Sequence, residues 1–309
     1  MSAGPSGAVD RVLAWFDEHA RPLPWRDPAC SPWGVLVSEF MLQQTQVARV
    51  LPRWRAFLER WPDPASLAAA GEAEVLRAWD RLGYPRRALW LRRCAVAIRD
   101  EHGGRVPAEE AELRALPGIG PYTAAAVACF AFGRPTAVVD TNVRRVLARL
   151  FHGDAEAWPP NERRDRRAAR EAVPEPAPED PDAVARTARW NAAAMELGAL
   201  VCTAASPECG RCPVADACAW LAAGRPRPQA RPARRRQPRF AGSDREMRGR
   251  VLAVLRARDA PVPVAEARAA AVRDEAADAE RFDRALDTLA ADALLSVTAQ
   301  GELALPGEG

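Results

Sequence analysis

The sequence contains no lysine, so all 44 of its basic residues are arginines. Any reaction that requires a lysine amine, such as Schiff-base formation with a sugar, is therefore excluded for this chain. Histidine is almost as scarce, and His19, His102 and His152 lie far apart. This spacing argues against a histidine-built metal site or a Ser-His-Asp triad. Aromatic residues make up 6% and include only two tyrosines, Tyr84 and Tyr122, so each tyrosine is a candidate for a specific role.

Signals for export and membrane insertion are also lacking. The first residues, Met-Ser-Ala-Gly-Pro-Ser-Gly, have neither the basic start nor the apolar stretch of a secretory signal. The longest uncharged run, 115–133, is broken in its first third by two prolines and two glycines. The helix that remains is too short to span a bilayer. Seven cysteines in such a chain predict a cytoplasmic protein whose thiols bind metal or stay reduced.

The remaining composition is that of a globular protein, with 48% hydrophobic and 28% charged residues. A length of 309 residues predicts about two domains. The net charge of +3 is too small to identify a partner, so the distribution of charge matters more than its sum.

Apolar spacing predicts helix after helix over residues 9–224, with a proline-rich surface loop and a short helix at 153–182. Residues 225–242 alternate proline with arginine and predict an extended linker. Residues 243–309 follow as a separate small module. Its expected elements are helices at 244–257, 264–271 and 279–295 and a hairpin of 294–298 and 302–305, a winged-helix-like pattern.

Four cysteines are clustered near the end of the long helical region. Cys202, Cys209, Cys212 and Cys218 have the spacing C-x6-C-x2-C-x5-C, with turn-forming residues between them. Four thiolates within so short a segment can close around one metal centre, which the spacing alone leaves open between zinc and an iron–sulfur cluster. The other cysteines, Cys30, Cys94 and Cys129, have apolar neighbours and are expected in the core.

A glycine-containing turn joins two helical stretches at residues 116–123. Gly118, Ile119 and Gly120 allow the backbone to turn tightly, and Pro121 suits the first position of a helix. Amides at such a helix start can bind a phosphate, although a plain helix–helix corner explains the same residues.

Two carboxylates stand in apolar surroundings. Glu39 lies within the helical run Val-Ser-Glu-Phe-Met-Leu, where a buried acid would have a raised pKa and could donate a proton. The alternative for Glu39 is a solvent-facing position. Asp140 follows two valines and precedes a new helix, where it could also act as an ordinary N-cap.

Taken together, these motifs resemble the adenine DNA glycosylases of the MutY type, in the helix-hairpin-helix base-excision superfamily. The resemblance rests on Ser-Glu-Phe-Met-Leu-Gln-Gln-Thr, Leu-Pro-Gly-Ile-Gly-Pro-Tyr-Thr, Val-Val-Asp-Thr-Asn-Val and the four-cysteine loop, in order within 9–224. It implies an all-α, two-lobed fold and a 4Fe–4S cluster rather than zinc. The implied partner is double-stranded DNA of the nucleoid, from which adenine opposite 8-oxoguanine or guanine is removed.

The resemblance also implies roles for individual residues. Glu39 would protonate adenine and Asp140 would stabilise the oxocarbenium-like sugar, with Tyr122 and Asn142 positioning both. The remaining matches are expected to contact DNA. Trp25, Arg26 and Glu196 would line the pocket for the extruded base, Gln44, Thr45, Leu82 and Tyr84 would meet the opposite base, and Gly118, Ile119 and Gly120 would bind phosphate. Core packing remains an alternative for Leu82.

Three rival functions fit less well. An endonuclease III type enzyme attacks the sugar with a lysine, whereas this chain has Tyr122 at that position and no lysine, which predicts a monofunctional glycosylase. A mismatch thymine or uracil glycosylase needs no ring protonation, so Glu39 favours adenine. A DNA-binding regulator with a redox-sensing cluster would leave Glu39 and Asp140 unexplained.

The chain departs from the family pattern after the linker. MutY-type enzymes usually end in a Nudix-like domain that helps to recognise 8-oxoguanine, and the helical pattern of 243–309 does not suit that fold. One hypothesis is that the arginine-rich linker and the module add phosphate contacts. The alternative is that the module stabilises the protein or binds another protein.

Overall fold

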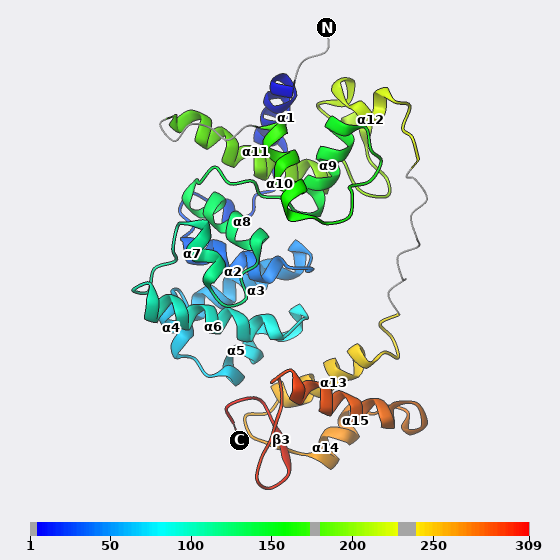
Figure 1. The fold of residues 1–309 in the computed structure, drawn as a ribbon. Coiled ribbons are helices and arrows are strands. Elements are labelled where there is room, and N and C mark those ends of the chain that lie inside the picture. Colours follow the sequence, from blue (N-terminus) through cyan, green and yellow to red (C-terminus); the bar gives the residue numbers. More distant parts are fainter. Residues whose placement is uncertain (1–4, 174–179, 228–238, 309) are drawn as a thin grey trace. The chain divides into compact units, whose positions relative to one another are not determined.

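A computed structural model describes residues 5–173, 180–227 and 239–308 (Figure 1). The chain forms two compact units. Unit 1 contains Met1–Glu39, Pro107–Ala115 and Ile119–Pro232, and unit 2 contains Phe40–Val106, Leu116–Gly118 and Ala233–Gly309. Helices dominate both units, and within the described residues the strands lie in the C-terminal part of unit 2. The expected helical, two-lobed architecture is confirmed.

Unit 1 is built around helices α1, α9 and α11. In chain order its elements are α1 (Pro5–His19), η1 (Pro24–Arg26), the start of α2 (Pro32–Leu42), α7 (Glu110–Ala115), α8 (Pro121–Phe132), α9 (Thr141–His152), α10 (Glu162–Ala172), α11 (Pro181–Leu200), η3 (Cys209–Arg211), η4 (Ala215–Ala217) and α12 (Ala219–Ala222). Helix α11 packs against both α1 and α9. Val12, Val146, Trp190 and Leu197 are buried where these helices meet, and this burial is the main stabilising contribution to the unit.

Two helices of unit 1 are apolar on nearly every side. Helix α2 is buried throughout 33–41, and α8 is buried throughout 123–129, as expected for a helix without a polar face. Helix α8 begins with Pro121, where the missing amide costs no hydrogen bond, and ends at Gly133 in the left-handed conformation. This arrangement places Glu39 inside a buried helix and Tyr122 in the first turn of α8.

The first part of unit 2 is a small helical lobe. Its elements are the end of α2, α3 (Val47–Arg60), α4 (Pro64–Ala69), α5 (Glu72–Trp79), η2 (Asp80–Leu82) and α6 (Arg86–Glu101). Helix α6 packs against α4 and α5. Phe57 contacts Trp61 and Trp79 edge to face in the core of the lobe, with ring centroids 4.6 and 6.4 Å apart.

The C-terminal module of unit 2 has the expected three helices and a hairpin. It consists of α13 (Asp244–Arg256), β1 (Val262–Pro263), α14 (Val264–Ala271), α15 (Glu275–Ala291), β2 (Ser296–Val297) and β3 (Glu302–Ala304). The antiparallel sheet has the order β1-β3-β2, with Leu303 opposite both Val262 and Val297. This order of elements is that of a winged helix.

The module differs from the expectation in two details. Helix α15 begins at Glu275 instead of 279, because the Asp274 carboxylate accepts a hydrogen bond from the Ala276 amide at 3.1 Å and caps the helix earlier. Strand β1 has only two residues, too few for an alternating pattern, and was not expected.

The compact units do not follow the predicted domain boundaries, because Phe40–Val106 groups with the C-terminal module. Most of the predicted linker, 228–238, lies outside the described residues, as do 174–179 of the proline-rich segment. The expected short helix of that segment is present as α10. Among the helices of the described ranges, none combines the length and hydropathy that crossing a membrane requires.

Candidate active site and cysteine loop

Glu39 is a buried acid, which agrees with the functional interpretation of this residue and not with the solvent-facing alternative. It is 6% exposed. Burial raises the pKa of its carboxyl group to about 7, with a further contribution from the charge of Asp140, against the opposing effect of a hydrogen bond with Tyr122. At neutral pH this carboxyl group is therefore protonated in a large fraction of molecules.

Tyr122 is hydrogen-bonded to one of the two carboxylates and lies near the other. Its hydroxyl hydrogen-bonds Glu39, and its pKa is raised well above the ordinary value by burial and by the charges of Glu39 and Asp140. The tyrosine therefore stays neutral and can serve only as a hydrogen-bonding group. The structure brings Glu39, Tyr122 and Asp140 together within unit 1, from α2, α8 and the start of α9.

Asp140 is the N-cap of α9, so the structural interpretation of this residue is confirmed. Its carboxylate accepts hydrogen bonds from the Val143 amide and from Asn142 Nδ2, both at 2.7 Å. Burial raises the pKa of Asp140, while these hydrogen bonds oppose the increase. The capping geometry leaves the aspartate fixed by its own helix and close to Glu39.

Asn142 is held in turn by Arg145, one turn along α9. Arg145 Nη2 donates to Asn142 Oδ1 at 2.7 Å and to the Gly198 carbonyl at 2.6 Å, and its Nε donates to the Cys202 carbonyl at 2.6 Å. A continuous hydrogen-bonded path therefore links Asp140 to the start of the cysteine loop.

Gly198 permits the close approach of α11 to α9 at this point. A Cβ atom on Gly198 would lie 2.7 Å from Asn142 Cβ and 2.9 Å from the Asn142 carbonyl oxygen. Neither neighbour is the free end of a flexible side chain, so the two helices would have to separate.

Gly198→Ala is therefore expected to lower the free energy of unfolding by about 1–3 kcal/mol and to reduce turnover, because Asn142 holds Asp140. Urea denaturation and a single-turnover assay measure the two effects. Gly249→Ala is the matched control, since a Cβ there meets nothing within 4 Å in α13, and it should be neutral or stabilising. Equal behaviour of the two variants would contradict the proposed contact.

A second polar group of unit 1 surrounds Glu196. Its side chain has no exposed surface. Arg21 donates to both carboxylate oxygens at 2.7 Å, and Arg26 donates to Oε2 at 2.9 Å. Burial alone would raise the pKa of Glu196, but hydrogen bonds from Arg21 and then Arg26 outweigh it and lower that pKa to about 2. Trp25 is buried beside Arg26 in η1. Sequence reasoning identified three of these residues and missed Arg21.

The four residues predicted to meet the opposite base lie in unit 2. Gln44 and Tyr84 are exposed, both in the left-handed backbone region, with φ of 56° and 48°. Thr45 is partly buried. Leu82 is only 3% exposed, which agrees with the core-packing alternative for this residue.

Arg87 links the segment 43–45 to the segment 82–84 by hydrogen bonds. Its guanidinium donates to the carbonyls of Gln43 at 2.6 Å and Gly83 at 3.1 Å and to Thr45 Oγ1 at 2.9 Å. The side chain is buried, and burial lowers its pKa to about 10, so the group remains charged at neutral pH. Sequence reasoning did not find Arg87.

The predicted hairpin turn is present between α7 and α8. Gly118 has a φ of 78°, and a Cβ there would lie 2.8 Å from Trp90 Cβ and 3.1 Å from Phe40, so glycine is required on two grounds. Ile119 is buried, and Gly120 is the N-cap of α8.

The four clustered cysteines follow α11 in one loop. Burial raises the pKa of Cys212 to about 11, and the charges of Cys202, Cys218 and Cys209 add to this increase, so the sulfurs are near neighbours. Arg149 Nη1 approaches Cys202 Sγ at 3.5 Å, and Cys218 Sγ donates to the Arg149 carbonyl at 3.5 Å. Over the described ranges, no three His, Cys, Asp or Glu side chains are arranged to hold a metal ion.

The other cysteines were expected in the core. Cys94 and Cys129 are buried as expected, whereas Cys30 is partly exposed in the loop before α2. The expectation for Cys30 was wrong because the loop, rich in proline and polar residues, does not bury it.

Comparisons with known proteins identify the family of the chain. Residues 37–175 match the family model described as HhH-GPD superfamily base excision DNA repair protein. The chain is 50% identical to the adenine DNA glycosylase of Mycobacterium tuberculosis H37Rv, covering 99% of this chain and 96% of that protein. It is 51% identical to the adenine DNA glycosylase of Mycolicibacterium smegmatis, with 96% of each covered.

Among solved structures, a thermostable thymine-DNA glycosylase superimposes with a TM-score of 0.63 at 27% identity, covering 71% of this chain and 97% of that one. The fold and the near full-length identity to the mycobacterial proteins lead to one conclusion. This chain belongs to the adenine DNA glycosylase family of the HhH-GPD base excision repair superfamily.

Proposed function

We propose that this protein is a monofunctional DNA glycosylase that removes adenine opposite 8-oxoguanine or guanine in double-stranded DNA. The observation that carries the proposal is the buried Glu39 carboxyl group, with a pKa of about 7, which is hydrogen-bonded to Tyr122 and lies within the influence of the charge of Asp140. Both DNA and a reducing environment are found in the cytoplasm, where we expect the protein to act.

The two carboxyl groups suit the two requirements of adenine removal. Adenine is a poor leaving group, so its ring must be protonated before the glycosidic bond breaks, and protonated Glu39 is a suitable donor. Bond cleavage leaves a positively charged sugar, which the Asp140 carboxylate can stabilise. Two backbone and side-chain hydrogen bonds hold Asp140 in place, so little reorganisation is needed during the reaction.

The base must leave the helical stack to reach these groups. We propose that Trp25 and Arg26 contact the extruded adenine, and that Glu196 and Arg21 fix the Arg26 guanidinium. The Arg26 side chain is partly exposed and can therefore contact a bound base, whereas the Glu196 carboxylate has no exposed surface and can act only through its arginine partners. We assign Gln44, Thr45 and Tyr84 to the opposite base and the hairpin turn to a DNA phosphate.

The cysteine loop fits a metal cluster in its donor chemistry. Four neighbouring thiolates repel one another, and a bound cationic centre removes that repulsion. We propose that Cys202, Cys209, Cys212 and Cys218 hold a 4Fe–4S cluster, which would stabilise the loop and offer one-electron redox chemistry. Arg149 and Arg145 would fix the loop, through their bonds to the sulfur and carbonyl of Cys202.

The cluster assignment predicts a brown protein with about four iron atoms per chain when purified without oxygen. Cys212→Ser is expected to lose iron and colour, whereas Cys30→Ser, a cysteine outside the loop, should keep both. Metal analysis and visible absorption measure this. A colourless protein with about one zinc per chain would contradict the assignment.

A panel of duplexes tests the proposed function. Adenine is placed opposite 8-oxoguanine, guanine or thymine, and thymine is placed opposite guanine in a further duplex. We expect release of adenine from the first two duplexes and no borohydride-trapped enzyme–DNA adduct, because the chain lacks lysine. Release of thymine alone would reject the adenine assignment, and a trapped adduct would reject the monofunctional one.

A further inference from the structure

The segment 80–84, here called the Tyr84 loop, connects α5 to α6 and is unusually constrained. Asp80 and Tyr84 are not glycines, yet both have positive φ values, 45° and 48°. Such conformations are unfavourable for residues with a side chain and persist only where neighbours enforce them. The Tyr84 ring at the end of the loop is 49% exposed.

Residues of the small helical lobe secure part of this loop. Trp79 Nε1 and Arg87 Nη2 both donate to the Gly83 carbonyl at 3.1 Å. Arg53 pairs with the Asp80 carboxylate, and Arg49 donates to the Arg81 carbonyl. These contacts leave the Asp80 carbonyl for a different partner.

That partner is Arg256, the last residue of α13 in the C-terminal module. Its Nη1 donates to the Asp80 carbonyl at 2.7 Å. The side chain is largely removed from water: its Nε is buried without a hydrogen-bond partner among the described residues, and burial lowers its pKa to about 10. Removing much of a cation from water is costly, and within the described ranges only the carbonyl and the charge of Asp80 offset that cost, so Arg256 differs from an arginine that extends freely into solvent.

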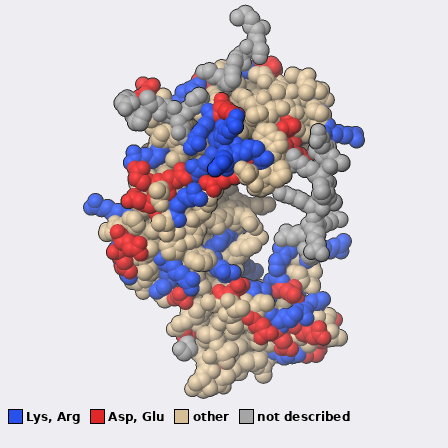
Figure 2. Space-filling view, in the orientation of Figure 1, with Lys and Arg blue, Asp and Glu red and all other residues tan. Residues whose placement is uncertain are grey.

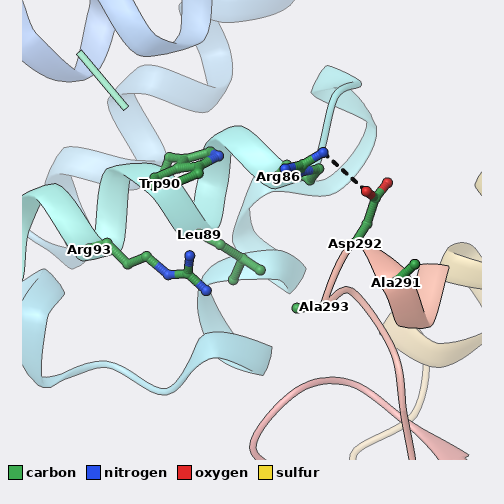
Figure 3. Close-up of a pocket in the computed structure, with 7 residues that line it drawn as sticks. All are labelled: Arg86, Leu89, Trp90, Arg93, Ala291, Asp292 and Ala293. Atoms are coloured by element: carbon green, nitrogen blue, oxygen red, sulfur yellow. Dashed lines mark hydrogen bonds and ion pairs between the residues drawn. The ribbon is translucent and has the colours of Figure 1, made fainter. Parts of the chain in front are cut away.

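The module also contacts both helices that flank the loop. On α5, Arg77 pairs with Glu308 at 2.6 Å and donates to the Arg258 carbonyl. At the start of α6, Arg86 pairs with Asp292 at 3.0 Å, beside a cavity of about 180 Å³ that Trp90 also lines (Figure 3). The module therefore holds the loop from its two ends and at Asp80.

The charge of the module argues against a main role in binding phosphate. Residues 243–308 contain nine arginines and thirteen acidic residues, and Figure 2 shows acidic side chains intermingled with basic ones on its visible face. Helix α15, the third helix of the winged-helix arrangement, has five acidic residues and two arginines. A surface with net negative charge repels the DNA backbone.

We propose that the C-terminal module is an intramolecular brace for the Tyr84 loop, with Arg256 as the positioning residue. The inference rests on the proposed function, in which the exposed Tyr84 ring enters the DNA beside the opposite base. An aromatic wedge stacks productively only if its backbone is fixed, because inserting it between bases already costs unstacking energy. The brace supplies that rigidity from a module that need not touch DNA.

A double-mutant cycle on the full-length protein tests the brace. Arg256→Met is expected to lower kcat/KM on adenine opposite 8-oxoguanine about tenfold, mainly by raising KM. The reason is that Tyr84 would be misplaced, and small misplacements of a contact residue reduce rates by up to about 10²-fold. In a Tyr84→Ala background the same change should have less than a twofold effect, because the brace acts through Tyr84. Arg256→Lys, which retains a donor for the carbonyl, should recover most of the loss.

Arg258→Met is the matched control, because Arg258 lies two residues further along and its side chain pairs with Glu266 inside the module. It should remain within twofold of the parent. Additive effects of Arg256→Met and Tyr84→Ala, or equal behaviour of Arg256→Met and Arg258→Met, would overturn the brace.

Amide hydrogen exchange provides a readout that does not depend on activity. Arg256→Met is expected to accelerate exchange of residues 80–84 about tenfold, with helix α8 unchanged. An inactive parent protein would reject the proposed function, while the exchange result would still decide the brace. Unchanged exchange in the loop would reject the brace even in a fully active enzyme.

Discussion

Asp140→Asn is expected to slow adenine release by about 10³-fold while DNA binding stays within about threefold of the parent. The substitution removes the negative charge that stabilises the developing sugar cation, and one such stabilising group typically contributes about 10²–10³-fold in rate. Asparagine is also a good N-cap, so α9 should retain its start. Single-turnover kinetics with excess enzyme measure the rate, and fluorescence anisotropy measures the affinity.

Asp180→Asn is the matched control for this experiment. Asp180 is likewise an N-cap, accepting a hydrogen bond from the Ala183 amide at 3.0 Å, but it is exposed at the start of α11. The control should turn over at the parental rate. An Asp140→Asn variant that remains as active as this control would show that Asp140 is merely a cap.

Glu39→Gln is expected to lower the rate by about 10²–10⁴-fold, the usual contribution of general acid catalysis. It should also stabilise the protein at high pH. Since folding moves the pKa of Glu39 from 4.5 to about 7, its ionisation above pH 7 destabilises the folded state by on the order of 3 kcal/mol. Glutamine is neutral at every pH and avoids this cost.

The sign of the stability effect follows from proton binding. The folded state binds the Glu39 proton more tightly than the unfolded state, so this contribution to stability is complete below pH 4.5 and is lost as the pH rises to about 7. Glu39→Gln should therefore be more stable than the parent at pH 8 and similar to it near pH 4.5. Urea denaturation at both pH values measures this, with the exposed Glu18→Gln as control. A destabilised variant at pH 8 would contradict the raised pKa of the buried Glu39 carboxyl group.

The features predicted well from sequence have local signals. The cap at Asp140, the glycine turn at Gly118 and the elements of the winged-helix module all depend on residues within a few positions of one another. Glu39 was identified as a candidate because it is an acid within an apolar helical run, where burial would be costly, and the family resemblance then implied its role. Each of these predictions follows from the spacing of apolar residues in a helix or from the residue types that a turn or cap requires.

The features that were missed depend on which elements face each other. Arg87 and Arg145 are buried donors and Arg256 is a partly buried one, but a chain with 44 arginines gives no local signal that separates them from the solvent-exposed ones. Gly198 looks like an unfavourable helix residue until Asn142 is found against it. Grouping of the C-terminal module with Phe40–Val106 is similarly a long-range property, which sequence periodicity does not encode.

The pH dependence of single-turnover adenine release tests the central claim most directly. If the buried Glu39 carboxyl group supplies the proton, the rate on adenine opposite 8-oxoguanine should fall about tenfold per pH unit above pH 7, where Glu39 loses its proton. The fall should be absent in Glu39→Gln. A rate that rises with pH, or the same profile in both proteins, would contradict the account.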